Sequence, residues 1–295
     1  MDIYRTPEER FLNLPDYPFG PHEVSVNGLR MHYLDEGAGD PVLMLHGEPT
    51  WSFLYRKMIP LIAQHHRALA PDYIGFGKSD KPTDDAYYTF ANHYANLAAF
   101  VTALDLTRIT LVMQDWGGPL GLRLATQQPE RIARLVILNT GLLSGEETSF
   151  TRGLLRWIER SQEILAGSIG ELMKRGGNMS DEVARGYDAP FPNRESKAGA
   201  RRFPLIIPRT PTDAGGPEMI ETRASLSRWD KPTLVMFGDA DRVFPPSVSE
   251  GFMQLIPNAE GPILIKGAGH YVQEEAGAEL AKNVLEFMAR LRRNA

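Results

Sequence analysis

The stretch Gln114-Asp115-Trp116-Gly117-Gly118 decides the fold of this chain, because it joins two segments of different hydrophobic pattern. Residues 108–113 before it are mostly apolar, which predicts a buried strand, and residues 119–125 after it predict a helix. An acidic side chain therefore occupies a tight strand-to-helix turn. We expect the turn to push Asp115 out above the edge of a sheet, while the small Gly117 lets helix and strand pack closely.

A strained strand-to-helix turn of this kind is the nucleophile elbow of the α/β-hydrolase fold. The position two before the expected nucleophile is Met113, so the serine pattern G-x-S-x-G is not matched. The match is to a variant with a carboxylate nucleophile. The competing interpretation of Asp115 is a helix N-cap, since Asp is preferred there and the helix dipole stabilises it.

A carboxylate at the elbow restricts the chemistry. A serine that displaced a leaving group from a saturated carbon would form an ether, which water does not readily cleave, whereas a carboxylate forms an ester that can be hydrolysed. Asp115 needs no base to be activated, because its ordinary pKa of about 3.9 leaves it ionised at neutral pH. A nearby histidine is then free to activate water.

The rest of the chain alternates strands with helices, which indicates a mostly parallel, doubly wound sheet. The sheet opens with an antiparallel hairpin around Asn27-Gly28, the dipeptide preferred in a type I′ turn. Residues 141–223 lack a clear strand and predict an inserted helical cap domain. Residues 1–140 and 224–295 are then the α/β-hydrolase core domain.

Composition excludes several classes of protein. The net charge of −5 gives no basic surface for nucleic acid, and no apolar run is long enough to span a bilayer. The chain has no cysteine, so thiolate metal sites and a cysteine nucleophile are excluded. The N-terminal residues lack the apolar core of a signal peptide. We expect a cytoplasmic monomer that acts on a small molecule, without contact to nucleic acid or membrane.

An aspartate nucleophile needs a base and an acid that orients the base. His270 is the base candidate, because every other histidine precedes Asp115 and the order in hydrolases is nucleophile, acid, histidine. Two acids follow the strand predicted after the cap, Asp239 and Asp241. We choose Asp241, because Asp239 directly follows the strand and is more typical of a turn. No pair of histidines has convincing metal-ligand spacing.

The reaction needs two kinds of hydrogen-bond donor, one for an oxyanion and one for a leaving anion. The backbone N–H groups of Glu48 and Trp116 are expected to hold the oxyanion of ester hydrolysis. A leaving halide fits an indole N–H, which donates from apolar surroundings, and Trp116 and Trp157 are the candidates. An ionised Glu48 side chain cannot donate, so we expect it to make no contact with halide. The alternative for Trp157 is an ordinary core position on a cap helix.

The chain resembles the haloalkane dehalogenases along nearly its whole length. The motifs that carry the resemblance are His46-Gly47-Glu48-Pro49-Thr50-Trp51, residues 72–82, Gln114 to Gly118, Ala189-Pro190-Phe191-Pro192 and Gly269-His270-Tyr271-Val272-Gln273-Glu274. The resemblance implies that Asp115 displaces halide from a haloalkane and that water activated by His270, which Asp241 supports, then hydrolyses the ester. The products are a primary alcohol, halide and a proton. The resemblance also implies a pocket lined by Phe203, Pro204, Val243 and Phe244, with no cofactor and no metal.

Other functions on the same fold stay open. An epoxide hydrolase shares the aspartate and the histidine but uses cap tyrosines, of which this chain offers Tyr187. A fluoroacetate dehalogenase would need arginines beside the nucleophile, where Trp116 stands. A non-catalytic ligand sensor on a hydrolase scaffold is the alternative from a different class.

Overall fold

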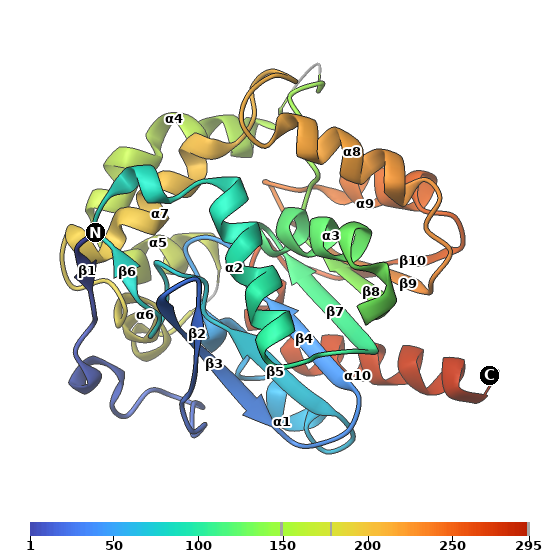
Figure 1. Cartoon of the computed structure of the whole chain (residues 1–295), viewed down its shortest axis with the longest axis horizontal. Coiled ribbons are helices and arrows are strands. Elements are labelled where there is room, and N and C mark those ends of the chain that lie inside the picture. Colours follow the sequence, from blue (N-terminus) through green and yellow to red (C-terminus); the bar gives the residue numbers. More distant parts are fainter. Residues whose placement is uncertain (148–149, 178, 294–295) are drawn as a thin grey trace.

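The computed structural model of the chain describes residues 1–147, 150–177 and 179–293. Its centre is an eight-stranded sheet with the strand order β10-β9-β8-β7-β4-β5-β3-β2 (Figure 1). Strands β10 to β5 in this order are parallel to their neighbours, whereas β3 and β2 are antiparallel. The strands are β2 (His22–Val26), β3 (Leu29–Glu36), β4 (Pro41–Leu45), β5 (Arg67–Pro71), β7 (Ile109–Gln114), β8 (Ile132–Leu138), β9 (Thr233–Gly238) and β10 (Ala259–Ile265), with a separate pair of β1 (Ile3–Tyr4) and β6 (Lys81–Pro82).

The predicted hairpin and parallel sheet are confirmed. Asn27 and Gly28 join β2 to β3 with φ angles of 50° and 82°, the positive values that a type I′ turn requires. Every residue of β4, β7 and β9 is buried. This burial explains their continuous apolar sequences, because parallel strands are covered by helices on both faces.

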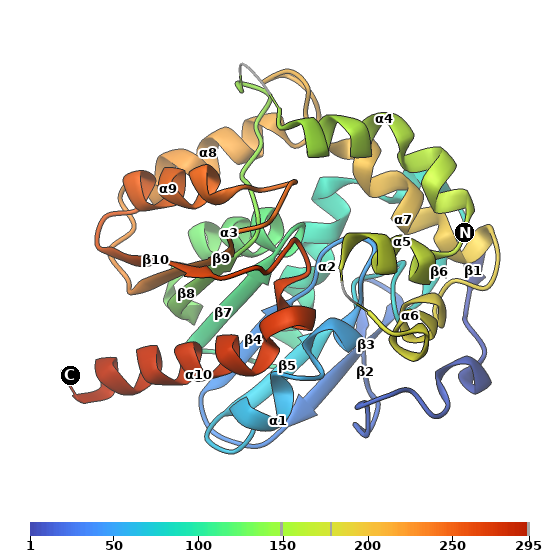
Figure 2. The same cartoon turned by 180° about the vertical axis from the view of Figure 1, so that it is seen from behind.

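Helices cover both faces of the sheet. On one face α2 (Phe90–Ala103), α3 (Gly117–Gln127) and α8 (Gly216–Leu226) pack together, in front in Figure 1. Helix α9 (Pro246–Leu255) packs against β9 and β10 and lies beside α8 (Figure 2). On the other face lie α1 (Ile59–Ile62) and α10 (Val272–Arg293), which contact each other. Helix α10 has a non-helical residue at Ala276, which kinks it after its first turn. Short 3-10 helices are η1 (Glu8–Phe11), η2 (Ser52–Tyr55), η3 (Asp85–Tyr87), η4 (Pro129–Arg131), η5 (Glu195–Lys197) and η6 (Phe203–Ile206).

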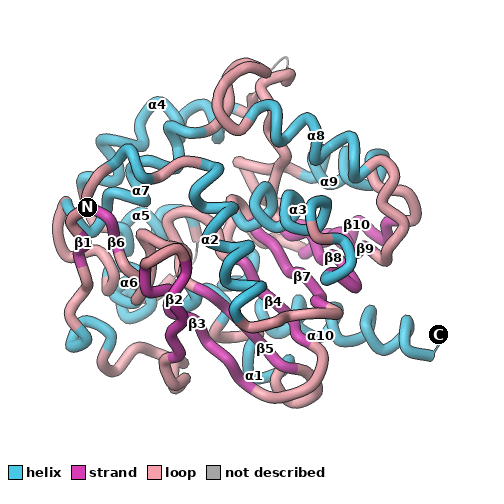
Figure 3. Tube along the Cα trace, viewed as in Figure 1, coloured by secondary structure: helices cyan, strands magenta, loops and turns pink. Residues whose placement is uncertain are grey.

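The helices predicted as a cap lie beyond the carboxyl ends of β4 and β7 (Figures 1 and 2). They are α4 (Arg152–Ala166), α5 (Ile169–Gly176), α6 (Asp181–Asp188) and α7 (Ala198–Arg202). The predicted boundary at residue 223 falls inside α8, which continues unbroken to Leu226. Helix α8 is joined to α3 by the ion pair of Arg123 with Glu221, 2.7 Å. The described residues between β8 and α4, and those between η6 and α8, form loops (Figure 3).

No helix within the described ranges combines the length and apolarity that a bilayer crossing requires.

Candidate active site

The predicted elbow has the expected geometry. Asp115 lies between β7 and α3 with φ of 49°, a left-handed conformation that is uncommon for any residue other than glycine. Its backbone is held on both sides, because its N–H donates to the Asn139 carbonyl at 3.0 Å and its carbonyl accepts from the Thr140 hydroxyl at 2.6 Å. A Cβ on Gly117 would lie 2.2 Å from the Leu45 carbonyl oxygen, so this position needs glycine.

The loop after β4 supplies a backbone donor to Asp115. The Glu48 N–H donates to Asp115 Oδ1 at 2.8 Å. A Cβ on Gly47 would lie 2.3 Å from the Asp115 Cβ, so only glycine permits this approach. His46 braces the loop: Nδ1 lies 2.8 Å from the Gly47 carbonyl oxygen, and Nε2 lies 3.1 Å from the Tyr73 amide that donates to it. Burial lowers the pKa of His46 to about 4, which keeps it neutral.

The loop after β10 brings His270 between two carboxylates. Its Nδ1 lies 3.0 Å from Asp241 Oδ2, and its Nε2 lies 3.5 Å from Asp115 Oδ2. Asp241 also accepts from the Asn139 amide at 2.7 Å and from the backbone amides of Val243 and Phe244 at 2.7 and 3.1 Å. The structure therefore brings together the three residues selected from the sequence.

Asp239, the rejected alternative, is exposed and accepts from the Gly267 amide at 2.7 Å. It closes a turn, as the sequence predicted. Two supporting residues were missed: Asn139, which donates to Asp241, and Gln114, whose amide donates to the His270 carbonyl at 3.1 Å. The only sequence signal for either is a polar side chain at the carboxyl end of an apolar strand.

The charges of the three residues are coupled. Burial opposes protonation of His270, but Asp241 and Asp115 outweigh it and raise the pKa of the imidazole to about 10. Burial opposes ionisation of Asp241, yet the attraction of His270 and the Asn139 hydrogen bond hold its pKa below the usual value. With Asp115 ionised, His270 is therefore held as an imidazolium between the carboxylates.

The side chain of Glu48 lies in surroundings that disfavour its ionised form. Glu48 is buried, and its Oε1 has no hydrogen-bond partner among the described residues. Burial, followed by repulsion from Asp115, raises its pKa well above the ordinary value. This shift favours the carboxylic acid, which can donate a hydrogen bond that a carboxylate cannot. The sequence interpretation treated Glu48 as an ionised group that cannot donate, and the burial that disfavours this ionised form comes from tertiary packing.

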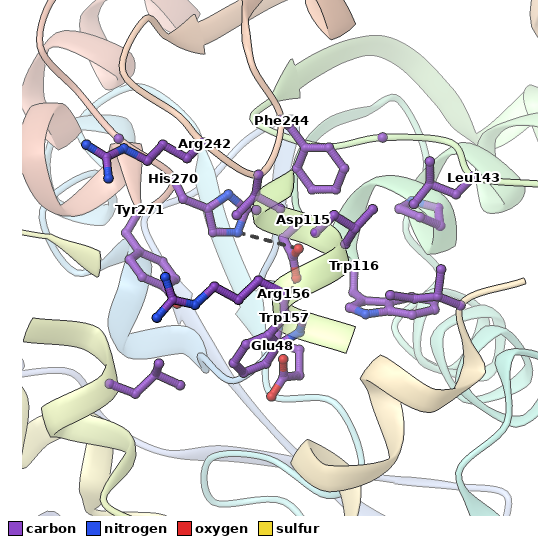
Figure 4. Close-up of a pocket in the computed structure, with 18 of the residues that line it drawn as sticks. Glu48, Asp115, Trp116, Leu143, Arg156, Trp157, Arg242, Phe244, His270 and Tyr271 are labelled. Atoms are coloured by element: carbon purple, nitrogen blue, oxygen red, sulfur yellow. Dashed lines mark hydrogen bonds and ion pairs between the residues drawn. The ribbon is translucent and has the colours of Figure 1, made fainter. Parts of the chain in front are cut away.

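A cavity of about 680 Å³ opens at these residues. Asp115, Glu48 and His270 line it together with Trp116 and Trp157 (Figure 4). Val243 and Phe244 line it as expected, and so does Tyr271, which the sequence interpretation did not select. Such a volume lies within the range of about 300–1,000 Å³ that small-molecule sites occupy.

Of the four tryptophans, two line this cavity. Trp116 and Trp157 both pack against the apolar cluster of Leu154, Ile158 and Ile207. The Trp51 indole already donates to the Gly186 carbonyl at 3.1 Å, and Trp229 is buried away from the cavity lining. The two indoles selected as halide donors are therefore those that a cavity ligand can reach.

Phe203 and Pro204 do not line the cavity as the resemblance implied. Both are buried, and Phe203 packs edge-on against the Trp116 ring with 4.8 Å between centroids. The lining residues from this segment are Ile206, Ile207 and Pro208. The turn of η6 places Phe203 behind Trp116 and brings the following residues to the cavity wall.

The cap tyrosine, Tyr187, lies outside the cavity lining. The Tyr187 hydroxyl donates to Glu274, which pairs with the buried Arg56, and Tyr187 is not among the lining residues. Among the described residues, no three His, Cys, Asp or Glu side chains gather as metal ligands would.

The fold and the acid–histidine–acid arrangement define the class of protein. Residues 40–277 match the family model described as the alpha/beta hydrolase fold, and the chain is an α/β hydrolase. A haloalkane dehalogenase of Psychrobacter cryohalolentis is 43% identical to it, over 98% of this chain and 98% of the relative. The solved tetrameric haloalkane dehalogenase of Paraglaciecola agarilytica is 37% identical with a TM-score of 0.91, over 96% of this chain and 97% of its own.

The chain belongs to the haloalkane dehalogenases, hydrolases that act on carbon–halide bonds. A more distant relative is a cis-3-alkyl-4-alkyloxetan-2-one decarboxylase of Shewanella oneidensis, 36% identical over 92% of this chain and 89% of its own. Because the Paraglaciecola relative is tetrameric, the monomer expected from the sequence stays a prediction.

Proposed function

We propose that this chain converts haloalkanes to primary alcohols through a covalent alkyl ester on Asp115, with His270 as base and Asp241 as the acid that orients it. The observation that carries the proposal is the position of the Asp115 carboxylate. Its Oδ1 accepts from the Glu48 amide at 2.8 Å, and its Oδ2 faces the His270 Nε2 at 3.5 Å.

In the first step, an Asp115 oxygen attacks the carbon that bears the halogen. A carbon–oxygen bond forms, the carbon–halogen bond breaks, and the halide departs with its electron pair. The indole N–H groups of Trp116 and Trp157 hold the halide in a cavity of largely apolar side chains, where hydrogen bonds to an anion are strong. Glu48, as a carboxylic acid, is a further donor in the same cavity.

In the second step, water attacks the carboxyl carbon of the ester. Esterification removes the negative charge of Asp115, which is one of the causes that raise the pKa of His270. The His270 imidazolium therefore releases its proton more readily. His270 Nε2 then takes a proton from the attacking water, and the backbone amides of Glu48 and Trp116 hold the oxyanion. Collapse of the intermediate expels the alcohol and restores the Asp115 carboxylate.

The division into two domains supports this reaction. We assign residues 1–140 and 224–295 to the core, which supplies the nucleophile, base and acid, and residues 141–223 to the cap, which supplies Trp157. The continuity of α8 favours moving the second boundary to about Gly215, the left-handed residue that caps α8. The cap then closes the cavity over Asp115 and limits the entry of bulk water.

The alternatives lose support from particular contacts. An epoxide hydrolase would use Tyr187 on the epoxide oxygen, but its hydroxyl is bound to Glu274 outside the cavity lining. A non-catalytic sensor would have no need of two indole donors beside a carboxylate. The Shewanella relative acts on a β-lactone, so lactone decarboxylation is the rival that a substrate test should include.

Bromide release from 1-bromobutane and 1,2-dibromoethane tests the proposal, with Asp115→Ala as control and with styrene oxide and a cis-3,4-dialkyl β-lactone as rival substrates. Repeated turnover of the bromides that vanishes in the control supports it. Diol from the epoxide, or carbon dioxide from the lactone, without bromide release would replace it.

A further inference from the structure

The outer part of the cavity is lined by positive charge that the proposed reaction does not use. Arg156, Arg175 and Arg242 line the cavity and are exposed. None of them forms an ion pair or side-chain hydrogen bond with another described residue. By contrast, Arg160, one turn further along α4 than Arg156, pairs with Glu163 at 3.1 Å and does not line the cavity.

Backbone packing places two of these arginines at the same rim. A Cβ on Gly153 would lie 2.2 Å from the Arg242 carbonyl oxygen, and the Thr151 hydroxyl donates to the Val243 carbonyl at 2.8 Å. The first turn of α4 is thus held against the loop after Asp241. Arg156 follows Gly153 by three residues and lies on the same helix face. In Figure 4, Arg156 and Arg242 lie on the His270 side of the cavity, away from Trp116.

The acidic side chains that line the cavity lie at other positions than the three arginines. Asp115 and Glu48 are at the inner end, where side-chain exposure of Asp115 is 15% and Glu48 is buried. The third lining acid, Glu275, accepts a hydrogen bond from the Gly269 amide. The exposed part of the lining thus carries three arginines and one acid, Glu275, which accepts a backbone hydrogen bond, whereas the Asp115 carboxylate lies at the inner end; apolar residues such as Ile164 and Leu172 are also in the lining.

We propose that the cavity takes haloalkanes that carry an anionic group, such as a carboxylate, at the end of the chain remote from the halogen, with Arg156 and Arg242 binding that group. The inference rests on the proposed function, because the halogenated carbon must reach Asp115. A guanidinium matches a carboxylate with two parallel hydrogen bonds. A short acid such as bromoacetate is excluded, because its carboxylate would lie against the Asp115 carboxylate.

The test compares bromide release from 6-bromohexanoate and 1-bromohexane, which differ in the charged end. The measured quantity is kcat/KM for 6-bromohexanoate divided by kcat/KM for 1-bromohexane. Both values are measured on one preparation of each variant, so that any loss of folded protein cancels. We expect Arg156→Gln and Arg242→Gln each to lower the ratio about threefold to tenfold, the range of partly exposed charge contacts. The change should appear mainly as a higher KM for 6-bromohexanoate, and the ratio should fall further in the double variant.

Two controls sharpen the comparison. Arg160→Gln changes the same charge on the same helix and should leave the ratio unchanged. In (6-bromohexyl)trimethylammonium a cation replaces the carboxylate, so the effect of the substitutions should be opposite. The double variant should have a higher kcat/KM for this cation than the unsubstituted chain has. Higher salt should also lower the ratio, because exposed charges are screened over about 10 Å at 0.1 M ionic strength.

The outcomes separate the two proposals. Absence of bromide from both substrates would overturn the proposed function. Turnover of 1-bromohexane with a ratio that neither arginine substitution changes would overturn the anionic substrate class alone. Equal losses on both substrates would also overturn it, since they would assign the arginines to halide release or folding.

Discussion

Nε2 of His270 lies 3.5 Å from Oδ2 of Asp115, on the side of the ring opposite the 3.0 Å contact of Nδ1 with Asp241. This position suits a base that acts only after Asp115 has become an ester, because Nε2 faces the carboxyl group whose carbon the water must attack. The free enzyme holds His270 as an imidazolium, which does not hinder the first step, since Asp115 needs no base.

Replacement of His270 by Phe should separate the two steps. We expect His270→Phe to release about one bromide per active site and then stop, because the ester forms but no base activates water. Intact mass should show the protein heavier by the alkyl group. Asp115→Ala should give neither bromide nor adduct, and an unmodified His270→Phe protein after exposure to 1-bromobutane would rule out the ester.

Lowering the pH should slow the hydrolysis of the ester more than it slows the release of halide. The Asp241 contact raises the pKa of His270, and the base is active only when deprotonated, so turnover should rise with pH through the pKa of His270 in the ester form. That pKa should be below the value of about 10 in the free enzyme, because the charge of Asp115 is gone. Rapid-quench measurements at low pH should show a halide burst that is at least as large as at high pH, with correspondingly more ester accumulated. A burst that shrinks in parallel with turnover would contradict this.

Glu48→Gln tests the protonation of a buried acid. If Glu48 is neutral, glutamine preserves both its charge and its donor capacity, so the pKa of His270 measured by NMR should not change. Asp115→Asn, the matched removal of a real charge, should lower it. At alkaline pH the unsubstituted enzyme should lose activity as Glu48 ionises, and Glu48→Gln should not. A clear fall in the His270 pKa in Glu48→Gln would show that Glu48 is ionised.

Trp157→Phe should weaken halide binding and slow the first step, because one indole donor is lost while the apolar bulk remains. Loss of one hydrogen bond to an anion corresponds to about 1.5–3 kcal/mol. Bromide quenching of fluorescence measures binding, and the burst rate measures the step. Trp229→Phe is the control, since Trp229 does not line the cavity. Equal quenching in both variants would assign the donor elsewhere.

The sequence predicted the sheet, the elbow and the order of Asp115, Asp241 and His270, because each depends on local patterns at strand ends. It did not predict which cap residues reach the cavity: Phe203 packs behind Trp116, and Ile206 takes its place in the lining. The raised pKa of Glu48 was not predicted for a similar reason. Its environment is created by segments far apart in the chain, and no local pattern encodes their packing.

A buried histidine behind the site should limit stability in acid. His93 is 1% exposed, its Nε2 has no partner among the described residues, and its ring packs on Phe203 at 4.3 Å. Burial, with a further contribution from His46, lowers its pKa to about 3. Because the unfolded chain takes up this proton near pH 6.5 and the folded chain does not, His93 should destabilise the fold progressively as the pH falls from about 6.5 toward 3.

His93→Leu should therefore gain stability relative to the unsubstituted protein as the pH falls. From pH 7.5 to pH 5 the difference in free energy of unfolding between the two should grow by about 2 kcal/mol in favour of the variant, since an unfolded-state pKa near 6.5 is crossed in that interval. Urea unfolding at the two pH values measures it. His65→Gln, which removes an exposed histidine, should show no such growth. If the difference between His93→Leu and the unsubstituted protein is the same at both pH values, His93 is protonated inside the fold and its ring must have a partner there.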